Sequence, residues 1–360
     1  MKIIHIVEAS ATGTLAMLSL LANAQSSQGY NIKVIYSVRK ETPINFSDHF
    51  DPRINLIQIQ MLSLKEKIKS IRLIREIYLC ESPDAVIMHS SFAGFIGRLA
   101  GLTVLPNTSF LYIPHCISFV RSDIGWIKKF IFTCFEWIGA IKRSSYVACS
   151  NSERIMISKF IPFRKCYLVE NAVKDFPKFN HKPSSTKTIV TVGQIRQQKG
   201  PYEYANIAKK IIALNSEIIF RWVGDGDEET KQILIDAGVE ITGWVSKDQV
   251  IDYLSCSTVY LSTAHWEGMP VSLIEANYAN LPVVASACSG NVDVVSHGET
   301  GWLFNNETEA VKFIMTALDR PDLSNKVIKN AAREAMHRFN VERYVSDMNS
   351  LIVKDLEKRL

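Results

Sequence analysis

Short apolar runs alternate along nearly the whole chain with longer stretches whose apolar residues recur every three to four positions. The short runs are typical of buried strands, and the longer ones, such as residues 15–28 and 64–78, have the period of amphipathic helices. Strands are expected at residues 2–7, 32–37, 55–59, 85–89, 110–113, 146–149 and 166–169, and again at 188–192, 218–223, 239–241, 259–261 and 283–285. Regular alternation of this kind predicts parallel sheets with helices on both faces.

The alternation lapses once, over residues 171–187, which are polar, contain two prolines and lack any period. Such a stretch is typical of a linker between domains. We therefore predict an α/β fold of two doubly wound, Rossmann-like domains, at residues 1–172 and 173–340, facing each other across a cleft at the carboxyl edges of their sheets. Residues 341–360 form a last helix that finds little room in the pattern of the second domain.

The composition agrees with a globular protein of this size. The 360 residues are 47% hydrophobic and 21% charged, which is enough for two cores and excludes an intrinsically disordered chain. No stretch approaches about 20 uncharged apolar residues, and the first apolar run ends at Glu8, as in a strand rather than a signal peptide. Seven scattered cysteines without a C-x-x-C pair indicate a reduced compartment. We expect a cytoplasmic protein.

The first half of the chain is basic. Residues 1–177 hold 21 Lys and Arg against 13 Asp and Glu, whereas residues 178–360 hold 20 against 23, so an anionic partner is expected for the first half. Residues 64–75 and 124–143 combine cations with apolar residues, and the second stretch adds aromatics. Part of these stretches could dock on the inner leaflet of the cell membrane. The alternative, which we expect for most of their apolar residues, is that they cover the sheet. No recognition motif indicates nucleic acid.

The strongest chemical signal is the segment Trp266–Ala276, WEGMPVSLIEA. Gly268 and Pro270 suit a tight turn before a helix, so Glu267 is expected in the turn and Glu275 about one turn into the helix. A carboxylate can accept hydrogen bonds from two neighbouring sugar hydroxyls, and the N–H groups at a helix start suit a phosphate. The alternative is an ordinary pair of acids, one at a helix N-terminus and one on a solvated face.

This segment resembles the E-x7-E signature of retaining, family-4 glycosyltransferases with the GT-B fold. Further segments resemble motifs of that family in the same order along the chain. They are residues 112–115 (YIPH), 149–153 (CSNSE), 192–200 (VGQIRQQKG), 222–226 (WVGDG) and 300–303 (TGWL, a turn). The resemblance covers nearly the whole chain, densely in the second half and loosely in the first.

The resemblance implies an enzyme that moves a hexose-type sugar from a nucleotide diphosphate donor to a saccharide hydroxyl with retention of configuration. It implies an acceptor-binding first domain, a nucleotide-sugar-binding second domain and a last helix that returns to the first. The acceptor is expected to be a lipid-linked saccharide in surface-polysaccharide assembly, such as O-antigen or lipopolysaccharide. No cofactor and no metal are implied, because cations on a short glycine-bounded loop can neutralise the departing diphosphate.

Specific side chains acquire roles by the same resemblance. Glu275 is expected to hold the ribose hydroxyls, Glu267 the donor sugar and Lys199 the diphosphate. His115, in the loop after the strand at residues 110–113, is expected to approach the donor sugar. An isolated histidine is more often structural.

Main-chain groups are implied as further contacts of the donor. The amides of Gly268, Met269 and the neighbours of Pro270, which has no N–H itself, are expected to meet sugar or phosphate oxygens. Trp244 and Val245 belong to a segment expected to line the base pocket through its main chain, although ordinary packing is the alternative for Trp244.

Two loops depart from the family pattern. In the loop of Gly193, Gln194 stands where the family usually has Arg, and Arg196 either supplies the missing guanidinium or points elsewhere if the segment stays extended. In the first loop only Gly13 remains of a pair of glycines, ahead of a helix expected to begin near Leu15. The amides around Gly13 could still meet phosphate or acceptor.

Other interpretations stay open. His5 and His89 lie within or at the end of apolar strands and are expected to be core or strand-end residues, although His89 could line the cleft. A sugar-nucleotide epimerase or phosphorylase of the same fold is the nearest rival function. A catalytically inactive relative that binds a nucleotide or a partner is a second rival, which the intact Glu267, Glu275 and Lys199 argue against.

Overall fold

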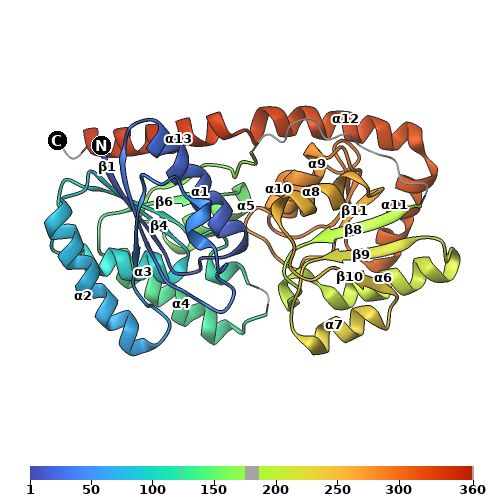
Figure 1. Cartoon of the computed structure of the whole chain (residues 1–360), viewed down its shortest axis with the longest axis horizontal. Helices are drawn as coiled ribbons and strands as arrows, with labels where there is room; N and C mark the ends of the chain where they lie inside the picture. The colour runs from blue at the N-terminus through green and yellow to red at the C-terminus, as the bar shows by residue number, and fades with distance from the viewer. Residues whose placement is uncertain (122, 175–185, 359–360) are drawn as a thin grey trace. The chain divides into compact units, whose positions relative to one another are not determined.

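The computed structural model describes residues 1–121, 123–174 and 186–358, so residues 175–185 of the expected linker lie outside the described residues. The contacts divide the chain into two compact units (Figure 1). Unit 1 comprises Met1–Asn171 and Val341–Leu360, and unit 2 comprises Ala172–Asn340. Among the described residues, no helix is both long and apolar enough to cross a bilayer.

The sheet of unit 1 is parallel throughout, in the order β3-β2-β1-β4-β5-β6-β7. The direction of strand addition reverses between β1 and β4, and in open α/β sheets this switch point is where ligands bind, at the carboxyl ends of the strands. The strands are β1 (Lys2–Val7), β2 (Asn31–Tyr36), β3 (Asn55–Gln58), β4 (Ala85–His89), β5 (Ser109–Ile113), β6 (Ser145–Ala148) and β7 (Cys166–Leu168).

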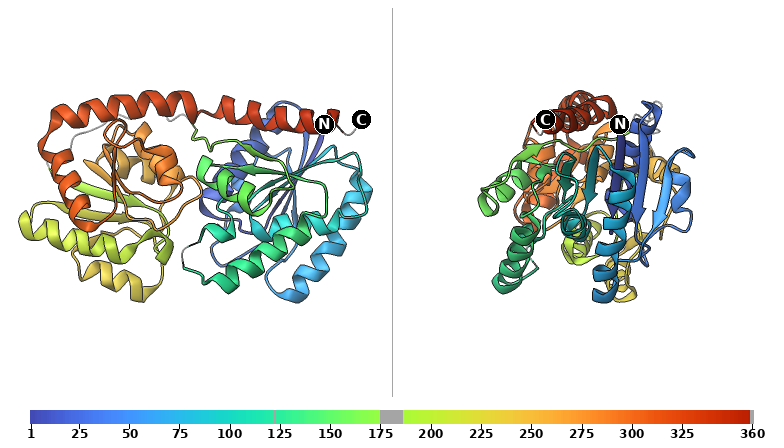
Figure 2. Two further views of the ribbon diagram at one scale, coloured as in Figure 1. Left: turned by 180° about the vertical axis from the view of Figure 1, so that it is seen from behind. Right: turned by 90° about the vertical axis from the view of Figure 1, so that its left-hand side faces the viewer.

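Helices cover both faces of this sheet (Figure 2). In Figure 1, α1 and α13 lie above the sheet of unit 1, and α2, α3 and α4 lie below it. The helices of unit 1 are α1 (Thr12–Ser27), α2 (Leu64–Glu81), α3 (Ser91–Ala100), α4 (Trp126–Gly139), α5 (Asn151–Phe160) and α13 (Val341–Glu357), with short 3-10 turns η1 (Phe46–His49) and η2 (Ser118–Val120).

Strand β1, its neighbour β4 and the next strand β5 are buried on both faces almost throughout, as a sheet between two helical layers requires. Glycines let α3 approach the sheet closely: a Cβ on Gly94 would lie 2.3 Å from the ring of Tyr112, and one on Gly97 would lie 2.8 Å from the sulfur of Met88. The helix therefore packs its backbone directly against β4 and β5, at the centre of the core.

The sheet of unit 2 repeats the same plan, in the order β10-β9-β8-β11-β12-β13, with its switch point between β8 and β11. Its strands are β8 (Thr188–Val192), β9 (Ile219–Val223), β10 (Val239–Ile241), β11 (Val259–Ser262), β12 (Val283–Ser286) and β13 (Trp302–Phe304). Its helices are η3 (Gln197–Lys199), α6 (Pro201–Leu214), α7 (Glu228–Ile235), α8 (Lys247–Ser255), α9 (Val271–Tyr278), α10 (Asn291–Val294), α11 (Glu307–Asp319) and α12 (Pro321–Arg338).

Two local predictions are wrong at least in part. Of residues 300–303, expected as a turn, Thr300 lies in a turn, but Trp302 and Leu303 belong to β13, an edge strand in which Leu303 pairs with Ala285 of β12. Helix α1 begins at Thr12 rather than near Leu15, because the carbonyl of Ala11 already accepts the N–H of Leu15 and closes the first turn. Gly13 is therefore a helical residue and not part of a loop.

The orientation of α4 also differs from the expectation that most of its apolar residues cover the sheet. The residues that α4 buries are Thr133, Glu136 and Gly139, whereas Trp126 is 78% exposed and Phe130 is 60% exposed. The further exposed apolar residues of this stretch are Ile127, Ile131, Phe135, Trp137, Ile138 and Ile141. The helix turns a polar stripe inward and an aromatic stripe outward.

A buried ion pair explains this inversion. The guanidinium of Arg98, fully buried on α3, donates to the Glu136 carboxylate at 2.8 Å and to the Tyr146 hydroxyl at 2.5 Å. The hydroxyls of Tyr112 and Tyr146 donate to the two carboxylate oxygens of Glu136 at 3.0 and 2.8 Å. A Cβ on Gly139 would lie 2.7 Å from Arg98, so the glycine makes room for the guanidinium. Polar contacts, rather than apolar ones, fix the inner face of α4.

Candidate active site

In unit 2, the loops that follow β8 and β11 meet at the switch point of the sheet. The Thr263 hydroxyl donates to the carbonyls of Lys199 and Gly200 at 2.9 and 2.8 Å, and the His265 N–H donates to the carbonyl of Gln198 at 2.9 Å. Gly200 has φ +64°, and a Cβ there would lie 2.0 Å from the carbonyl oxygen of Thr263. The two loops, one from each side of the switch point, are thus bonded into one structure.

This structure pairs a lysine with a carboxylate. Lys199 Nζ lies 2.7 Å from Glu267 Oε1, and Gln198 Nε2 donates to Glu267 Oε2 at 3.2 Å. Burial alone would lower the pKa of Lys199, but the Glu267 carboxylate and Tyr260 together outweigh burial, and the pKa is raised. Lys199 is therefore a cation at neutral pH, and among the described residues Glu267 is the one ion-pair partner that it has.

Glycines on two sides give this ion pair its space. Gly193 has φ +143°, and a Cβ there would lie 3.1 Å from Cε of Lys199. Gly290 has φ +89°, and its Cβ would lie 2.6 Å from Cβ of Glu267, whose N–H donates to the carbonyl of Ser289. Gly193 was expected at the site, whereas Gly290 was not, although the Ser-Gly pair after a predicted strand indicates a close turn.

The turn after Glu267 leads directly into α9. Gly268 and Met269 are buried, and Pro270 is the N-cap, whose carbonyl accepts the N–H groups of Leu273 and Ile274 at 3.2 and 3.3 Å. The first N–H groups of a helix have no partner within the helix and face whatever lies beyond its start. The predicted position of the turn and of the helix after it is correct.

Glu275 lies on α9 and is buried, in an ion pair with Lys247 of α8, whose side chain is half exposed. A capping box of Ser246 and Gln249 starts α8. Trp244, just before this cap, is 58% exposed, so ordinary domain packing does not explain it, and the neighbouring Val245 is partly exposed.

Tyr260 of β11 connects the two acidic positions. Its hydroxyl donates to Ser272 Oγ of α9 at 2.9 Å, and the charges of Lys199 and Glu267 both act on its pKa, which burial raises. Ser272 lies on the same helix as Glu275. Lys199, Glu267 and α9 therefore form one polar cluster at the carboxyl edge of the sheet.

Arg196 lies beside this cluster but is not part of it. Its carbonyl accepts the N–H of Lys199 at 2.8 Å, and its charge acts to lower the pKa of Lys199. Its side chain is exposed, with extended backbone, and no ion pair to it occurs among the residues that the structure describes. Gln194, two residues earlier, is partly exposed.

In unit 1, the switch point holds a row of three histidines. His5 of β1 and His89 of β4 are fully buried, and His5 Nδ1 lies 3.1 Å from His89 Nε2. His89 Nδ1 lies 3.0 Å from Nε2 of His115, in the loop after β5. Burial lowers the pKa of His5 and of His115 to about 4 and also lowers the pKa of His89 well below its usual value, so all three are neutral at neutral pH. The core interpretation of His5 and His89 is confirmed, but their link to His115 was missed.

The turn that carries His115 is fixed by a buried carboxylate. His115 has φ +58° and Cys116 φ +115°, a conformation that L side chains rarely adopt. Glu153 of α5 accepts the N–H groups of Cys116 and Ile117 at 2.9 and 2.8 Å. Glu153 is the last residue of the motif at residues 149–153 (CSNSE). Burial raises its pKa.

The end of β1 carries another acidic residue. Glu8 is buried and pairs with the guanidinium of Arg39, whose Nε donates to it at 3.0 Å. Gly13 lies in the first turn of α1 and has no side chain that could occupy the site. The N–H groups at the start of the helix lie close to it.

Taken by itself, unit 2 presents a cation, two buried carboxylates and a helix start at one sheet edge. Such a set can hold an anion beside a polyol, because the cation and amides donate to phosphate oxygens while carboxylates accept from hydroxyls. Unit 1 presents a partly exposed neutral imidazole on a rigid turn.

Comparisons with known proteins agree with this chemistry. Residues 173–334 match the family model described as "Glycosyl transferases group 1". A Klebsiella pneumoniae protein, "Uncharacterized 41.2 kDa protein in cps region", is 30% identical over 239 residues, which are 62% of this chain and 66% of that protein. An Escherichia coli relative, "UDP-Gal:alpha-D-GlcNAc-diphosphoundecaprenol alpha-1,3-galactosyltransferase", is 24% identical over 85% of this chain and 86% of its own. Sucrose-phosphate synthase from Thermosynechococcus elongatus has a similar fold, with a TM-score of 0.83 at 17% identity over 98% of both chains.

Proposed function

We propose, on the premise that the chain carries a glycosyl transferases group 1 domain over residues 173–334, that it is a retaining glycosyltransferase with a nucleotide diphosphate sugar as donor. The sugar, of hexose type, passes to a hydroxyl of a saccharide acceptor. The observation that carries the proposal is the ion pair of Lys199 and Glu267 at the switch point of unit 2, because an ammonium group with one partner keeps further N–H bonds for a ligand.

The chemistry follows from the charge that develops. When the bond between the anomeric carbon and the diphosphate breaks, the bonding electrons stay on the diphosphate. Lys199 and the N–H groups at the start of α9 stabilise this charge, so the proposal invokes no metal. The acceptor oxygen attacks the anomeric carbon from the face that the diphosphate leaves, its proton passes to the departing diphosphate, and the new bond keeps the anomeric configuration.

The carboxylates act on the donor without bonding to its carbon. Glu267 accepts hydrogen bonds from the donor sugar while it holds Lys199 in place. Glu275 accepts from the two ribose hydroxyls and exchanges its contact with Lys247 for them, which is feasible because Lys247 is half exposed. The exposed Trp244 and the main chain at Val245 lie next to this helix cap and suit the base.

The first experiment tests transfer and its charge requirement together. UDP-, GDP- and ADP-sugars are incubated with lipid-linked saccharides, and the anomeric configuration of the product is read by NMR. Lys199→Met should lower the transfer rate about 100- to 1,000-fold, since it removes a principal charge partner of the transition state. The matched control is Lys209→Met, at an exposed lysine of α6. An unchanged rate in Lys199→Met, or conversion of the donor without any acceptor, would overturn the proposal in favour of a different activity such as epimerisation.

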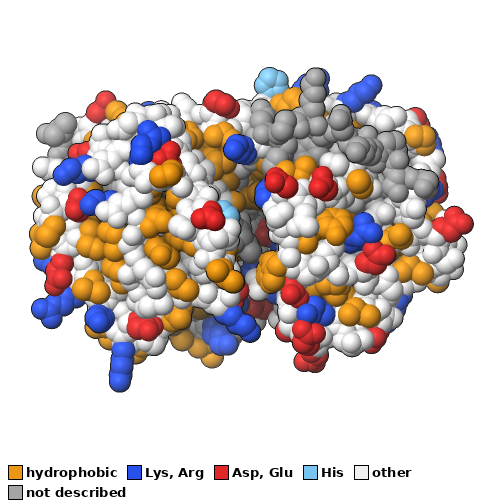
Figure 3. Space-filling view, in the orientation of Figure 1, with side chains coloured by type: hydrophobic (Ala, Val, Ile, Leu, Met, Phe, Trp, Pro, Cys, Tyr) orange, Lys and Arg blue, Asp and Glu red, His pale blue; other side chains and the backbone are white. Residues whose placement is uncertain are grey.

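We propose further that the acceptor is lipid-linked and that α4 docks unit 1 on an anionic membrane surface, as a step of surface-polysaccharide biosynthesis. The named activity of the Escherichia coli relative on a diphosphoundecaprenol substrate supports this. So does α4, because it carries exposed aromatic residues together with the exposed Lys128, and cations near anionic lipid add about 1 kcal/mol each. Figure 3 shows hydrophobic side chains gathered on unit 1, with Lys and Arg at its lower margin.

Vesicle flotation at low salt tests the docking. The protein should float with vesicles that contain phosphatidylglycerol and should not float with neutral ones. The double variant Trp126→Ser with Phe130→Ser should lose this binding, whereas Ile155→Ser, which removes an exposed apolar side chain of α5, should keep it. Equal flotation of both variants, or none by the unaltered protein, would refute the membrane part of the proposal and leave the transferase part standing.

A further inference from the structure

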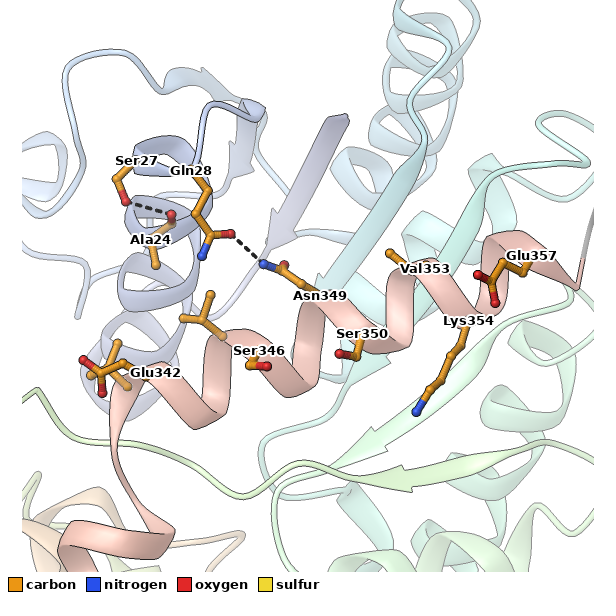
Figure 4. A pocket seen from close by; sticks show the side chains of 12 residues that line it. Ala24, Ser27, Gln28, Glu342, Ser346, Asn349, Ser350, Val353, Lys354 and Glu357 are labelled. Atoms are coloured by element: carbon orange, nitrogen blue, oxygen red, sulfur yellow. Dashed lines mark hydrogen bonds between the residues drawn. The ribbon is translucent and has the colours of Figure 1, made fainter.

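A continuous chain of hydrogen-bonded side chains runs through unit 1 from a surface groove to the turn after β5. The groove lies between α1 and α13, and Figure 4 shows the outermost bond, between the amide of Asn349 on α13 and that of Gln28, the residue that follows α1. The members, in order from the groove inward, are Gln28, Asn349, Gln25, His5, His89 and His115, with consecutive distances of 2.8, 2.9, 2.9, 3.1 and 3.0 Å.

The outer amides give the chain a direction. Asn349 Nδ2 donates to Gln28 Oε1, and Gln25 Nε2 donates to Asn349 Oδ1. The amide oxygen of Gln25 therefore faces His5 Nε2. An amide oxygen only accepts, so the proton of this bond belongs to His5 Nε2.

This first proton determines all the others. A neutral imidazole carries one N–H, so His5 Nδ1 is an acceptor and the bond to it is donated by His89 Nε2. By the same step His89 Nδ1 is an acceptor, and His115 Nε2 donates to it. His115 is then left with a proton on Nε2 and a lone pair on Nδ1. The neutrality that this requires agrees with the burial of His5 and His89, which lowers the pKa of both.

We propose that Gln25, His5, His89 and Asn349 are positioning residues that set the tautomer of His115, so that its Nδ1 accepts a hydrogen bond from a hydroxyl of the sugar substrate. That this hydroxyl belongs to a sugar substrate rests on the proposed function, whereas the tautomer of His115 does not. Among the described residues, no group bonds Nδ1 of the partly exposed His115, and Glu153 keeps its turn rigid.

The chain has two self-consistent directions and no intermediate one. If the amide of Gln25 turned over, its nitrogen would donate to His5 Nε2, every imidazole proton would move to the other nitrogen, and His115 Nδ1 would become a donor. His5 and His89 are fully buried, so water does not enter to break the sequence. The orientation of the amides near the surface therefore determines the tautomer of His115 at the sheet edge, and no net charge is involved.

Asn349 permits a test in both directions, because it is only partly buried and lies in the groove. Asn349→Asp can only accept from Gln25 Nε2 and so preserves the direction. Asn349→Lys can only donate, which turns the Gln25 oxygen toward residue 349 and reverses the direction. Ser350→Lys, at the exposed neighbouring position, adds the same charge without reaching Gln25 and serves as the control.

The readout is the tautomer of His115 in full-length protein labelled with 15N-histidine, from long-range proton–nitrogen NMR spectra. His115→Gln assigns the signal by its loss. The unaltered protein, Asn349→Asp and Ser350→Lys should show the proton on Nε2, and Asn349→Lys should show it on Nδ1. The same tautomer in Asn349→Lys as in the unaltered protein, or a proton on Nδ1 in the unaltered protein, would overturn the proposal.

Kinetics tests the link to substrate. A misdirected hydrogen bond to one hydroxyl should raise KM for the donor about tenfold in Asn349→Lys, while Ser350→Lys keeps the KM of the unaltered protein. A reversed tautomer with unchanged KM and kcat would refute the contact with substrate. If the unaltered protein transferred no sugar at all, the proposed function would fail, and the NMR result would still decide the tautomer.

Discussion

Arg98 with Glu136 in unit 1 and Lys199 with Glu267 in unit 2 are both ion pairs of a cation with a buried glutamate, and they differ in how completely the cation is bonded. In unit 1, Arg98 is fully buried and bonds Glu136, the Tyr146 hydroxyl and the carbonyl of Gly94. In unit 2, Lys199 lies at the sheet edge, is partly exposed and bonds Glu267. A fully buried cation that is bonded at each of its nitrogens, as Arg98 is, acts as a structural element, whereas a partly exposed one at a ligand-binding edge is available for chemistry.

The largest effect is expected from breaking the pair of unit 1. Arg98→Met leaves Glu136 buried without its cation, so the free energy of unfolding should fall by about 3–5 kcal/mol. Urea unfolding followed by circular dichroism measures this. Arg98→Met with Glu136→Leu should recover most of the loss, because no unpaired charge remains. A loss below about 1 kcal/mol in the single variant would mean that the pair does not stabilise unit 1 as argued.

Breaking the ion pair of unit 2 should have the opposite result, with a large loss of activity and a small loss of stability. Glu267→Gln keeps the shape and the bond to Gln198 but removes the charge beside Lys199. We expect transfer to fall about 100-fold or more, with a change in unfolding free energy of about 1 kcal/mol. Steady-state kinetics and urea unfolding on the same preparation separate the two. Full activity with reduced stability would place this pair in the same structural class as Arg98 and Glu136.

The buried histidines of unit 1 differ from both ion pairs because they are neutral in the folded state. The folded pKa of His5 is about 4, below its unfolded value of about 6.5, so the unfolded state binds a proton more readily. The stability that His5 contributes is complete above pH 6.5 and is lost as the pH falls toward 4, by roughly 2 kcal/mol at pH 5. Burial shifts His89 and His115 in the same direction, and the raised pKa of Glu153 acts in the opposite one.

His5→Gln isolates this contribution, because glutamine can keep hydrogen bonds but does not titrate. The fall in unfolding free energy between pH 7 and pH 5 should be smaller in the variant by roughly 2 kcal/mol, and hydrogen exchange should locate the acid-sensitive region at β1 and β4. An identical pH dependence in both proteins would mean that His5 is not held neutral in the folded state.

Sequence analysis succeeded where the signal is local. Strands such as Lys2–Val7 and Thr188–Val192 have the predicted bounds, and Glu267 lies in a turn ahead of a helix as the spacing indicated. In the charged site of unit 2, spacing relates Glu267 to Glu275 on one segment, whereas Lys199 comes from a distant segment that the pairing of β8 with β11 brings close. β13 was missed because residues 300–303 were assigned to a turn, although β10 and β7, edge strands that are equally short, were predicted.

The sequence did not predict contacts between residues that are far apart along the chain. His5, His89 and His115 lie on different strands and loops, and no spacing relates them before the strand order is known. For α4 the apolar period was visible, but which face turns inward depends on Arg98, 38 residues away from Glu136. An amphipathic pattern therefore predicts a helix and leaves its orientation to the buried polar groups of its neighbours.

The smallest effect is expected from Arg196, an exposed cation beside the pair of unit 2. Arg196→Ala should change the unfolding free energy by less than about 0.5 kcal/mol, since the side chain is solvated. If the guanidinium replaces the arginine that the family usually has at position 194, KM for the donor should rise up to about tenfold at low salt and converge with that of the unaltered protein at high salt, because exposed charges are screened.

Arg196→Lys sharpens this measurement. A lysine keeps the charge but not the planar fork that binds two phosphate oxygens, so it should restore binding fully if only the field matters and in part if the fork matters. Equal KM values for the unaltered protein and Arg196→Ala at low salt would assign the diphosphate to Lys199 and the start of α9 alone. Lys199 would then be the single cation that binds the donor diphosphate in unit 2. Lys199→Met would remove the whole contribution of side-chain cations to this binding.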